Sequence, residues 1–272
     1  MKIHPEPAKA FTLIELLVVL AVIALLAITL LPALAATKPK VEKINCINNL
    51  KQLGLAYRVW EAANNGHYPQ ALLATQGGAE NYCTHGGNNS PIGTAAAISY
   101  NPGMVYLVMS NYLVTPTLLF CPADTIHSGA ATNFSYGDLL SIATPPNHSN
   151  AAQLNLPTKV SYFVGADANE SDPQSILAGD CNIGNTGSFN DLPATARFGV
   201  NGNASLSAPE ITSIAFSGNA PTWAWTANDL HQKTGNLLIA DGSVQSTTIT
   251  GLHTFMQNAT NTVQGPCWNF LP

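Results

Sequence analysis

Several residues in this 272-residue chain have side chains and spacings that could support chemistry. An acid, Glu15, interrupts an otherwise uncharged apolar run near the N-terminus. A histidine, His231, is followed after nine residues by Asp241 and Gly242. Five cysteines lie along the chain: Cys46, Cys83, Cys121, Cys181 and Cys267. Each feature has a structural and a chemical interpretation, and the elements that position these residues decide between them.

The apolar run that contains Glu15 extends from Phe11 to Leu31. This is about the ~20 residues that a helix needs to cross a bilayer. A secretory signal would have a shorter core of roughly 7–15 residues and a small residue after it, whereas Ala10 stands before this run. An acid inside a membrane span is costly and usually has a partner. Glu15 is therefore either solvated at the interface near Lys9 or paired with a positive group on a neighbouring subunit.

The residues around this acid, Ala10-Phe11-Thr12-Leu13-Ile14-Glu15, resemble the cleavage and methylation motif of type IV prepilins and type II secretion pseudopilins. The resemblance implies that a prepilin peptidase cuts between Ala10 and Phe11 and that Phe11 is then N-methylated. It also implies that Glu15 pairs with the N-terminal amine of an adjacent subunit during assembly. Pro32 matches a helix-bending proline of that family. The family usually has Gly before the cut, so Ala10 departs from its pattern. The alternative to a prepilin motif is an ordinary signal anchor.

The resemblance also implies a location and partners. The chain would be a single-pass protein of the bacterial inner membrane with its N-terminus in the cytoplasm, and later part of a periplasmic or extracellular filament. Its partners would be the membrane, the prepilin peptidase, the secretion or pilus assembly platform and other copies of itself. We expect a structural subunit and not an enzyme. One alternative is a minor tip pilin or adhesin that binds carbohydrate through aromatics such as Trp223 and Trp225. Another is a membrane-tethered enzyme that uses His231 and Asp241.

Charge is sparse and uneven, with only 9% of residues charged. After Glu61 the basic residues are Lys159, Arg197 and Lys233, against eleven acids. An acidic distal region does not favour nucleic-acid binding, because phosphate contacts need a basic face.

The chain is expected to contain a leader at 1–10, a transmembrane and filament-core helix at 11–32, a stem helix at 33–65 and an exported domain at 66–272. Asn64-Asn65-Gly66 is a helix stop signal. Pro32 and Pro39 predict bends, since proline removes a backbone donor. Within the stem, apolar residues recur at steps of three and four, which predicts one apolar stripe that packs on the domain. The stripe is formed by Ile44, Ile47, Leu50, Leu53, Tyr57 and Trp60.

The exported domain is rich in turn-forming residues, and its apolar runs are short. Strands are expected at 160–166, 175–178, 211–217, 236–240 and 243–249. Asp241-Gly242 between the last two predicts a two-residue hairpin, because glycine accepts a positive φ. The expected fold is α+β and pilin-like: a long N-terminal helix packed on a small antiparallel sheet with long loops.

The segment from His231 to Gly242 is similar to the H-X9-DG signature of a pseudopilin-associated C-terminal domain in planctomycete- and verrucomicrobia-type bacteria. The favoured interpretation is structural: His231 and Asp241 hold the hairpin by hydrogen bonds. The alternative is a catalytic His–Asp pair or a metal site. The structural interpretation is preferred because no nucleophile or further ligand stands at a readable spacing.

The cysteines and one acidic loop complete the candidates. In the same group cysteines often stand at the positions of Cys46 and Cys121, which implies a bridge between stem and domain; unpaired thiols are the alternative. Export permits disulfides, and an odd number leaves at least one thiol over. Asp167, Asn169 and Asp172 are oxygen ligands for a calcium ion, but a solvated turn is favoured because the EF-hand spacing is missing. No other cofactor is expected.

Overall fold

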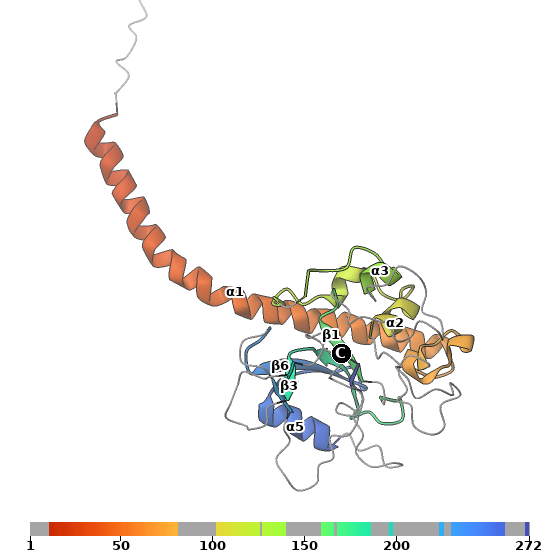
Figure 1. Cartoon of the computed structure of the whole chain (residues 1–272). Coiled ribbons are helices and arrows are strands. Elements are labelled where there is room, and N and C mark those ends of the chain that lie inside the picture. Colours follow the sequence, from red (N-terminus) through yellow and green to blue (C-terminus); the bar gives the residue numbers. More distant parts are fainter. Residues whose placement is uncertain are drawn as a thin grey trace, which may run out of the picture. The chain divides into compact units, whose positions relative to one another are not determined.

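The computed structural model describes residues 11–80, 102–125, 127–139, 159–165, 168–185, 196–197, 223–225, 230–258 and 270–271. The chain divides into two compact units, Met1–Val41 and Glu42–Pro272. Helix α1 (Leu13–Ala63) contributes to both units (Figure 1).

Apart from Glu15, the first part of α1 is apolar on every side. Its window Leu13–Leu30 is long and apolar enough to cross a membrane, and none of it is buried inside the structure. The helix is continuous through Pro32 and Pro39, so neither proline ends it. The bend expected at Pro32 stays a prediction.

The stem part of α1 buries one face within the second unit. The buried positions are Cys46, Leu50, Leu53, Ala56, Tyr57 and Trp60. Ile44 was expected in this stripe, but it is 56% exposed, because the face that packs begins at Cys46. The helix ends as expected: Asn65 and Gly66 have positive φ, and Gly66 N–H donates to Glu61 O.

The α+β expectation is confirmed by an antiparallel sheet of five strands in the order β7-β6-β2-β1-β8. Its strands are β1 (Tyr162–Gly165), β2 (Ile176–Asp180), β6 (Thr234–Ile239), β7 (Val244–Thr248) and β8 (Phe270–Leu271). Four of them, β1, β2, β6 and β7, correspond to predicted strands. The fifth predicted strand, at 211–217, lies outside the described residues.

A second sheet of three strands was not predicted. Its order is β4-β3-β5, with β3 (Ile183–Asn185), β4 (Ala196–Arg197) and β5 (Trp223–Trp225). Helix α5 (Ile249–Asn258) follows β7 directly. The stem part of α1 runs along one side of the larger sheet and α5 lies on the other (Figure 1).

The β6–β7 turn is longer than the sequence suggested. Ile239 and Ser243 are bonded across the hairpin, and Gly242 N–H donates to Ile239 O. The loop therefore contains three residues, Ala240, Asp241 and Gly242, so the two-residue prediction is wrong. Gly242 has φ +87°, as the last residue of such a loop requires.

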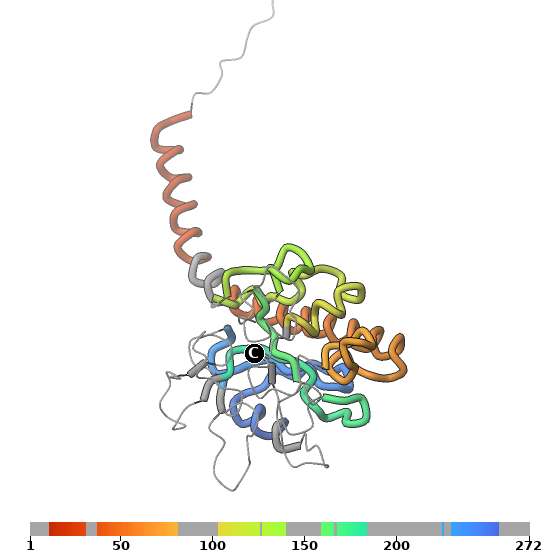
Figure 2. The backbone as a smooth tube through the Cα atoms, turned by 45° about the vertical axis from the view of Figure 1, so that its right-hand side comes forward, coloured from red at the N-terminus to blue at the C-terminus, as the bar shows by residue number. Residues whose placement is uncertain are grey.

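The segment 102–139 packs beside the stem part of α1 (Figure 2). It carries α2 (Pro102–Val108), the 3-10 turn η4 (Pro116–Leu119) and α3 (Tyr136–Leu139). Two further 3-10 turns, η1 (Pro69–Ala71) and η2 (Ala74–Gln76), follow α1. The fully buried Tyr106 donates its hydroxyl to Tyr162 O and Phe163 O, which ties α2 to β1.

Candidate functional site

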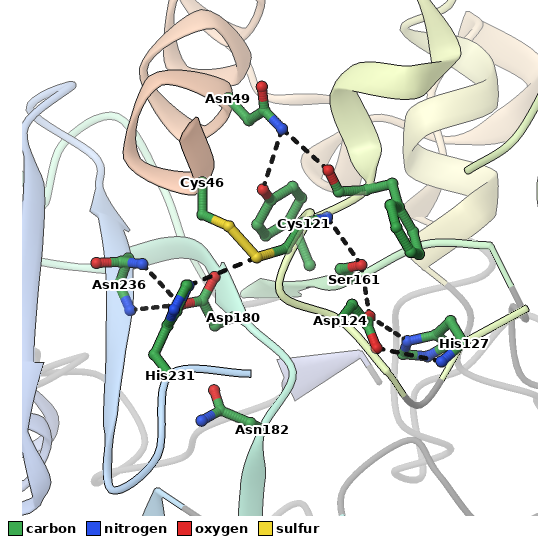
Figure 3. Close-up of a disulfide and its surroundings, with 12 residues drawn as sticks. Cys46, Asn49, Cys121, Asp124, His127, Ser161, Asp180, Asn182, His231 and Asn236 are labelled. Atoms are coloured by element: carbon green, nitrogen blue, oxygen red, sulfur yellow. Dashed lines mark hydrogen bonds and ion pairs between the residues drawn. A yellow bond between two sulfur atoms is a disulfide. The ribbon is translucent and has the colours of Figure 1, made fainter. Parts of the chain in front are cut away.

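A disulfide joins the stem helix to the segment after η4. Cys46 of α1 and Cys121 are bonded, with their Cα atoms 5.1 Å apart, and both side chains are fully buried (Figure 3). This is the pair that the resemblance had indicated. On α1, Asn49 lies one turn beyond Cys46 and donates to Phe120 O, next to Cys121, so covalent and hydrogen bonds hold the same contact.

The ring of His231 faces this disulfide and the end of β2. Its Nε2 atom lies 3.5 Å from Cys121 Sγ and 3.5 Å from Asp180 Oδ2. Asp241 Oδ1 accepts from Ser243 N–H within the hairpin turn, whereas the His231 ring contacts the disulfide and Asp180.

The backbone explains this outcome. Leu230, Gln232 and Lys233 all have positive φ, so the chain turns sharply before β6. The turn directs the His231 ring toward the disulfide and Asp180 (Figure 3). The Cys121 sulfur that this ring contacts is part of a disulfide, so it is not a thiol that the histidine could activate.

Asp180 is a fully buried carboxyl at the end of β2. Its Oδ2 atom accepts from the backbone N–H and the side-chain amide of Asn236, whereas Oδ1 has no hydrogen-bond partner among the described residues. Burial raises the pKa of Asp180 to about 7, against the hydrogen bonds from Asn236. Burial also lowers the pKa of His231 to about 4, and Lys43 lowers it further. At neutral pH the imidazole is therefore uncharged, and the contact is not a full ion pair.

A second polar group adjoins the disulfide. Ser161 Oγ donates to Asp124 Oδ2 at 2.5 Å and accepts from Cys121 N–H. His127 Nδ1 lies 2.5 Å from the same Asp124 oxygen, and His127 N–H donates to Asp124 Oδ1. These bonds fix the loop after Cys121 against the residue that precedes β1.

The N-terminal acid has a partner within its own chain. Thr12 donates its backbone N–H and its hydroxyl to Glu15 Oε2, at 3.0 and 2.9 Å. Glu15 N–H lies 3.3 Å from Thr12 Oγ1 and donates to it. This reciprocal arrangement is a capping box, in which a threonine and a glutamate three residues apart satisfy the first turn of a helix. The signal for this cap in the sequence is the pattern Thr-x-x-Glu directly before the apolar run.

The apolar side chains on both sides of this cap are exposed in the single chain, beginning with Phe11 at 73%. A continuous apolar surface of this length is not stable in water, so lipid or another protein must cover it.

Residues 7–31 match the prokaryotic N-terminal methylation motif. The motif supports a pilin-like or pseudopilin-like protein that is a substrate of a prepilin peptidase. A methylation motif of this type implies assembly into filaments generally, and together with the apolar helix it fits anchoring in the inner membrane before assembly. No curated protein and no solved structure is significantly similar to the chain.

Within the motif, the structure places Phe11, the capping box and the apolar helix in direct succession. The cut is expected between Ala10 and Phe11, and Ala10 lies outside the described residues.

The calcium candidates are engaged by their own loop. Asn169 Oδ1 accepts from Ser171 N–H, Ser171 Oγ and Asp172 N–H. Asp172 Oδ1 accepts from Gln174 N–H. These bonds form local turns, whereas Asp167 lies outside the described residues.

In the alternative of a tip pilin or adhesin, Trp225 would be an aromatic side chain that contacts the ligand. Trp225 is fully buried, and its Nε1–H donates to Thr247 Oγ1 at 3.2 Å. It therefore belongs to the core between the two sheets, and it is not available to a surface ligand.

Proposed function

We propose that this chain is a structural subunit, a pseudopilin or pilin-like protein, of a type II secretion or type IV pilus-like filament. The observation that supports the proposal is the methylation motif at 7–31, continuous with an apolar helix that has no cover of its own. The proposal includes a pilin-like fold and no enzymatic activity.

Processing would prepare the helix for assembly. The prepilin peptidase cuts between Ala10 and Phe11, and the new amine of Phe11 is methylated. The helix stays in the inner membrane until neighbouring copies replace the lipid around its apolar side chains. The chain thereby exchanges lipid contacts for helix–helix contacts.

Glu15 would serve two purposes in this process. Its Oε2 atom caps the first turn through Thr12. None of the described hydrogen bonds uses Oε1, so this atom remains an acceptor for the amine of an adjacent subunit. Such a contact would neutralise an acid that lipid disfavours.

The second unit would cover the filament surface in the periplasm or outside the cell. Its disulfide is of the kind that exported proteins retain. The H-X9-DG segment would then be structural, with His231 packed against the disulfide.

The test is the N-terminus of the mature chain. Mass spectrometry of protein from cells with an active prepilin peptidase should find a chain that begins at N-methyl-Phe11, and electron microscopy should find ordered polymers. Cells without the peptidase should retain Met1. An Ala10→Gly variant, which restores the residue usual in the family, should be cut faster and is the matched control. A chain that keeps Met1 beside an active peptidase and never polymerises would refute the proposal.

A further inference from the structure

Four side chains of metal-ligand type converge in the core of the second unit. Cys46 comes from α1, Cys121 from the segment after η4, Asp180 from the end of β2 and His231 from the turn before β6 (Figure 3). All four are buried or nearly so; the side chains of His231 and Asp180 are 3% and 0% exposed. The sequence separates them widely, so only the fold assembles the group.

Two of their distances fit a tetrahedral ion. Cys121 Sγ to His231 Nε2 and His231 Nε2 to Asp180 Oδ2 both measure 3.5 Å. A zinc ion with bonds of about 2.0–2.3 Å holds neighbouring ligand atoms roughly 3.3–3.7 Å apart. The Sγ atoms of Cys46 and Cys121 and a ring nitrogen of His231 all lie within 4.8 Å of one another. Two changes would complete the site. The two sulfur atoms must separate, which requires that the disulfide be reduced, and the Asp180 carboxylate must move toward them, because it is not part of the group within 4.8 Å.

We propose that the chain with reduced Cys46 and Cys121 binds one Zn²⁺ through these two thiolates, the imidazole of His231 and the carboxylate of Asp180. The donor set of two sulfurs, one nitrogen and one oxygen is of the kind that zinc prefers. The site goes beyond the proposed filament function, because it lies in the second unit and does not involve the N-terminal helix.

The charges of the site balance. Two thiolates and one carboxylate carry three negative charges, and the ion supplies two positive charges. Lys43 supplies the third: its field acts on both Asp180 and His231, and its ammonium group is fixed by a hydrogen bond to Thr234 Oγ1. A buried group of this kind is stable only when its charges are compensated.

The surrounding groups also hold the ligands in place. Asn236 orients the Asp180 carboxylate through two hydrogen bonds. The second carboxylate oxygen, Oδ1, accepts no hydrogen bond among the described residues, so the carboxylate has an unused acceptor. Outer bonds that orient a ligand are typical of metal sites.

Oxidation would convert the metal-bound form into the disulfide form. The zinc dithiolate reacts with a disulfide oxidant and two protons; the Cys46–Cys121 bond forms, the oxidant's sulfur–sulfur bond breaks, and two thiols and Zn²⁺ are released. The two sulfurs of the chain lose two electrons, and the oxidant gains them. The zinc form would therefore require a reducing environment.

A neighbouring group provides an internal comparison. Asp124, His127 and Cys181 also offer ligand atoms within 4.8 Å of one another. There the Asp124 carboxylate already accepts from Ser161 and His127 on both oxygens. Both oxygens of Asp124 are thus engaged, whereas Asp180 Oδ1 accepts no hydrogen bond among the described residues. We therefore assign the ion to the Cys46 group, and the second group serves as the control.

The experiment uses the full chain in detergent, reduced by a phosphine and titrated with Co²⁺ alone. We expect one Co²⁺ per chain, with the intense visible and thiolate-to-metal bands of a tetrahedral site, and displacement of the Co²⁺ by Zn²⁺. The oxidised chain should bind none. A reduced, folded chain that binds no Co²⁺ would overturn the proposal.

Variants locate the ion. His231→Ala and Asp180→Asn should weaken Co²⁺ binding roughly tenfold or more, the size of effect seen when the surroundings of a bound metal are altered. Cys46→Ser removes one thiolate ligand, so it should lower the intensity of the thiolate-to-metal band. The controls His127→Ala and Cys181→Ser should bind as the natural chain does. Loss of binding in the controls, with binding retained in His231→Ala, would place the ion in the other group and contradict the proposal.

Reduction could also unfold the chain, and circular dichroism with limited proteolysis settles that case. If the reduced, metal-free chain is unfolded, stoichiometric Zn²⁺ should restore protease resistance, because ligand binding and folding are coupled. A chain that stays protease-sensitive with Zn²⁺ present would overturn the proposal.

Discussion

Asp180 accepts two hydrogen bonds from Asn236 through a single oxygen, one from the backbone N–H at 2.7 Å and one from the side-chain amide at 2.8 Å. Both residues are completely buried. The pair joins the end of β2 to β6 beside the ring of His231, so the polar centre of the second unit depends on one carboxylate.

In the disulfide-bonded chain, Asp180→Ala should lower the free energy of unfolding by about 1–3 kcal/mol, because it leaves the N–H of Asn236 buried without an acceptor. Asp180→Asn keeps an acceptor oxygen and should cost less. Urea denaturation with the disulfide intact measures both. Equal losses in the two variants would show that the carboxylate oxygen is not what Asn236 needs.

Gly235 should not tolerate a side chain. A Cβ atom at this position would lie 2.5 Å from the Trp225 ring. Gly235→Ala should therefore lower the free energy of unfolding by about 1–3 kcal/mol, as overpacking does. In Trp225→Leu, whose side chain is smaller, the same alanine should cost clearly less, and a double-mutant cycle measures the difference.

A helical glycine is the matched control for this prediction. At Gly54 an added Cβ would meet the end of the Leu238 side chain at 2.8 Å, which can move aside. Alanine in a helix also gains about 1 kcal/mol over glycine. Gly54→Ala should therefore be milder than Gly235→Ala. A larger loss at Gly54 would mean that the packing around Trp225 is looser than described.

The ion pair of Asp138 should make stability depend on pH. Lys159 donates to Asp138 Oδ1, and Thr132 donates twice to Oδ2; together they hold the pKa of Asp138 well below its usual value. The lowered pKa means that the stabilisation is complete above the unfolded-state pKa of about 3.9. It is lost as the pH falls through the folded-state value.

Asp138→Asn should therefore be less stable than the natural chain by about 1 kcal/mol near pH 7, a modest value for a pair close to solvent. The difference should shrink below about pH 4, where the carboxylate takes up a proton in the unfolded chain while it is still ionised in the folded one. Thermal unfolding across this range measures the effect. A difference that stays constant down to pH 2 would exclude a role for the charge.

The two roles of Glu15 can be separated by substitution. Glu15→Gln keeps the capping box, since glutamine also serves at this position, but removes the charge. We expect normal membrane insertion and a large loss of filaments for both Glu15→Gln and Glu15→Ala. Thr12→Ala breaks the cap and keeps the charge, so filaments should form. Fractionation and electron microscopy measure these outcomes, and normal filament yield from Glu15→Gln would exclude pairing through the charge.

The sequence predicted those elements whose signals are local. The stem helix was readable from its apolar spacing and from the stop at Asn65 and Gly66. The hairpin was readable from Asp241-Gly242, but its length was not, because the turn type depends on which residues pair across it: Ile239 is bonded to Ser243. The second sheet was missed because two- and three-residue strands leave no periodic pattern.

The partners of His231 could not be read in the same way. Its contacts, Cys121 and Asp180, are set by three positive φ angles in residues that rarely adopt them, at Leu230, Gln232 and Lys233. One feature of Asp180 points to a special environment: it is an acid at the end of a fully buried strand. A charged residue there requires a compensating environment, which only the long-range packing of α1 and β6 reveals.

The position of the disulfide has a mechanical consequence. Glu42 begins the second unit, and Cys46 lies about one helical turn further along α1. Tension drawn along the helix from its apolar half meets a covalent crosslink before it reaches Leu50 and the packed positions beyond. The load passes into the segment after η4 through a bond far stronger than any side-chain packing, so the stem cannot be peeled off its domain from that end while the crosslink is intact.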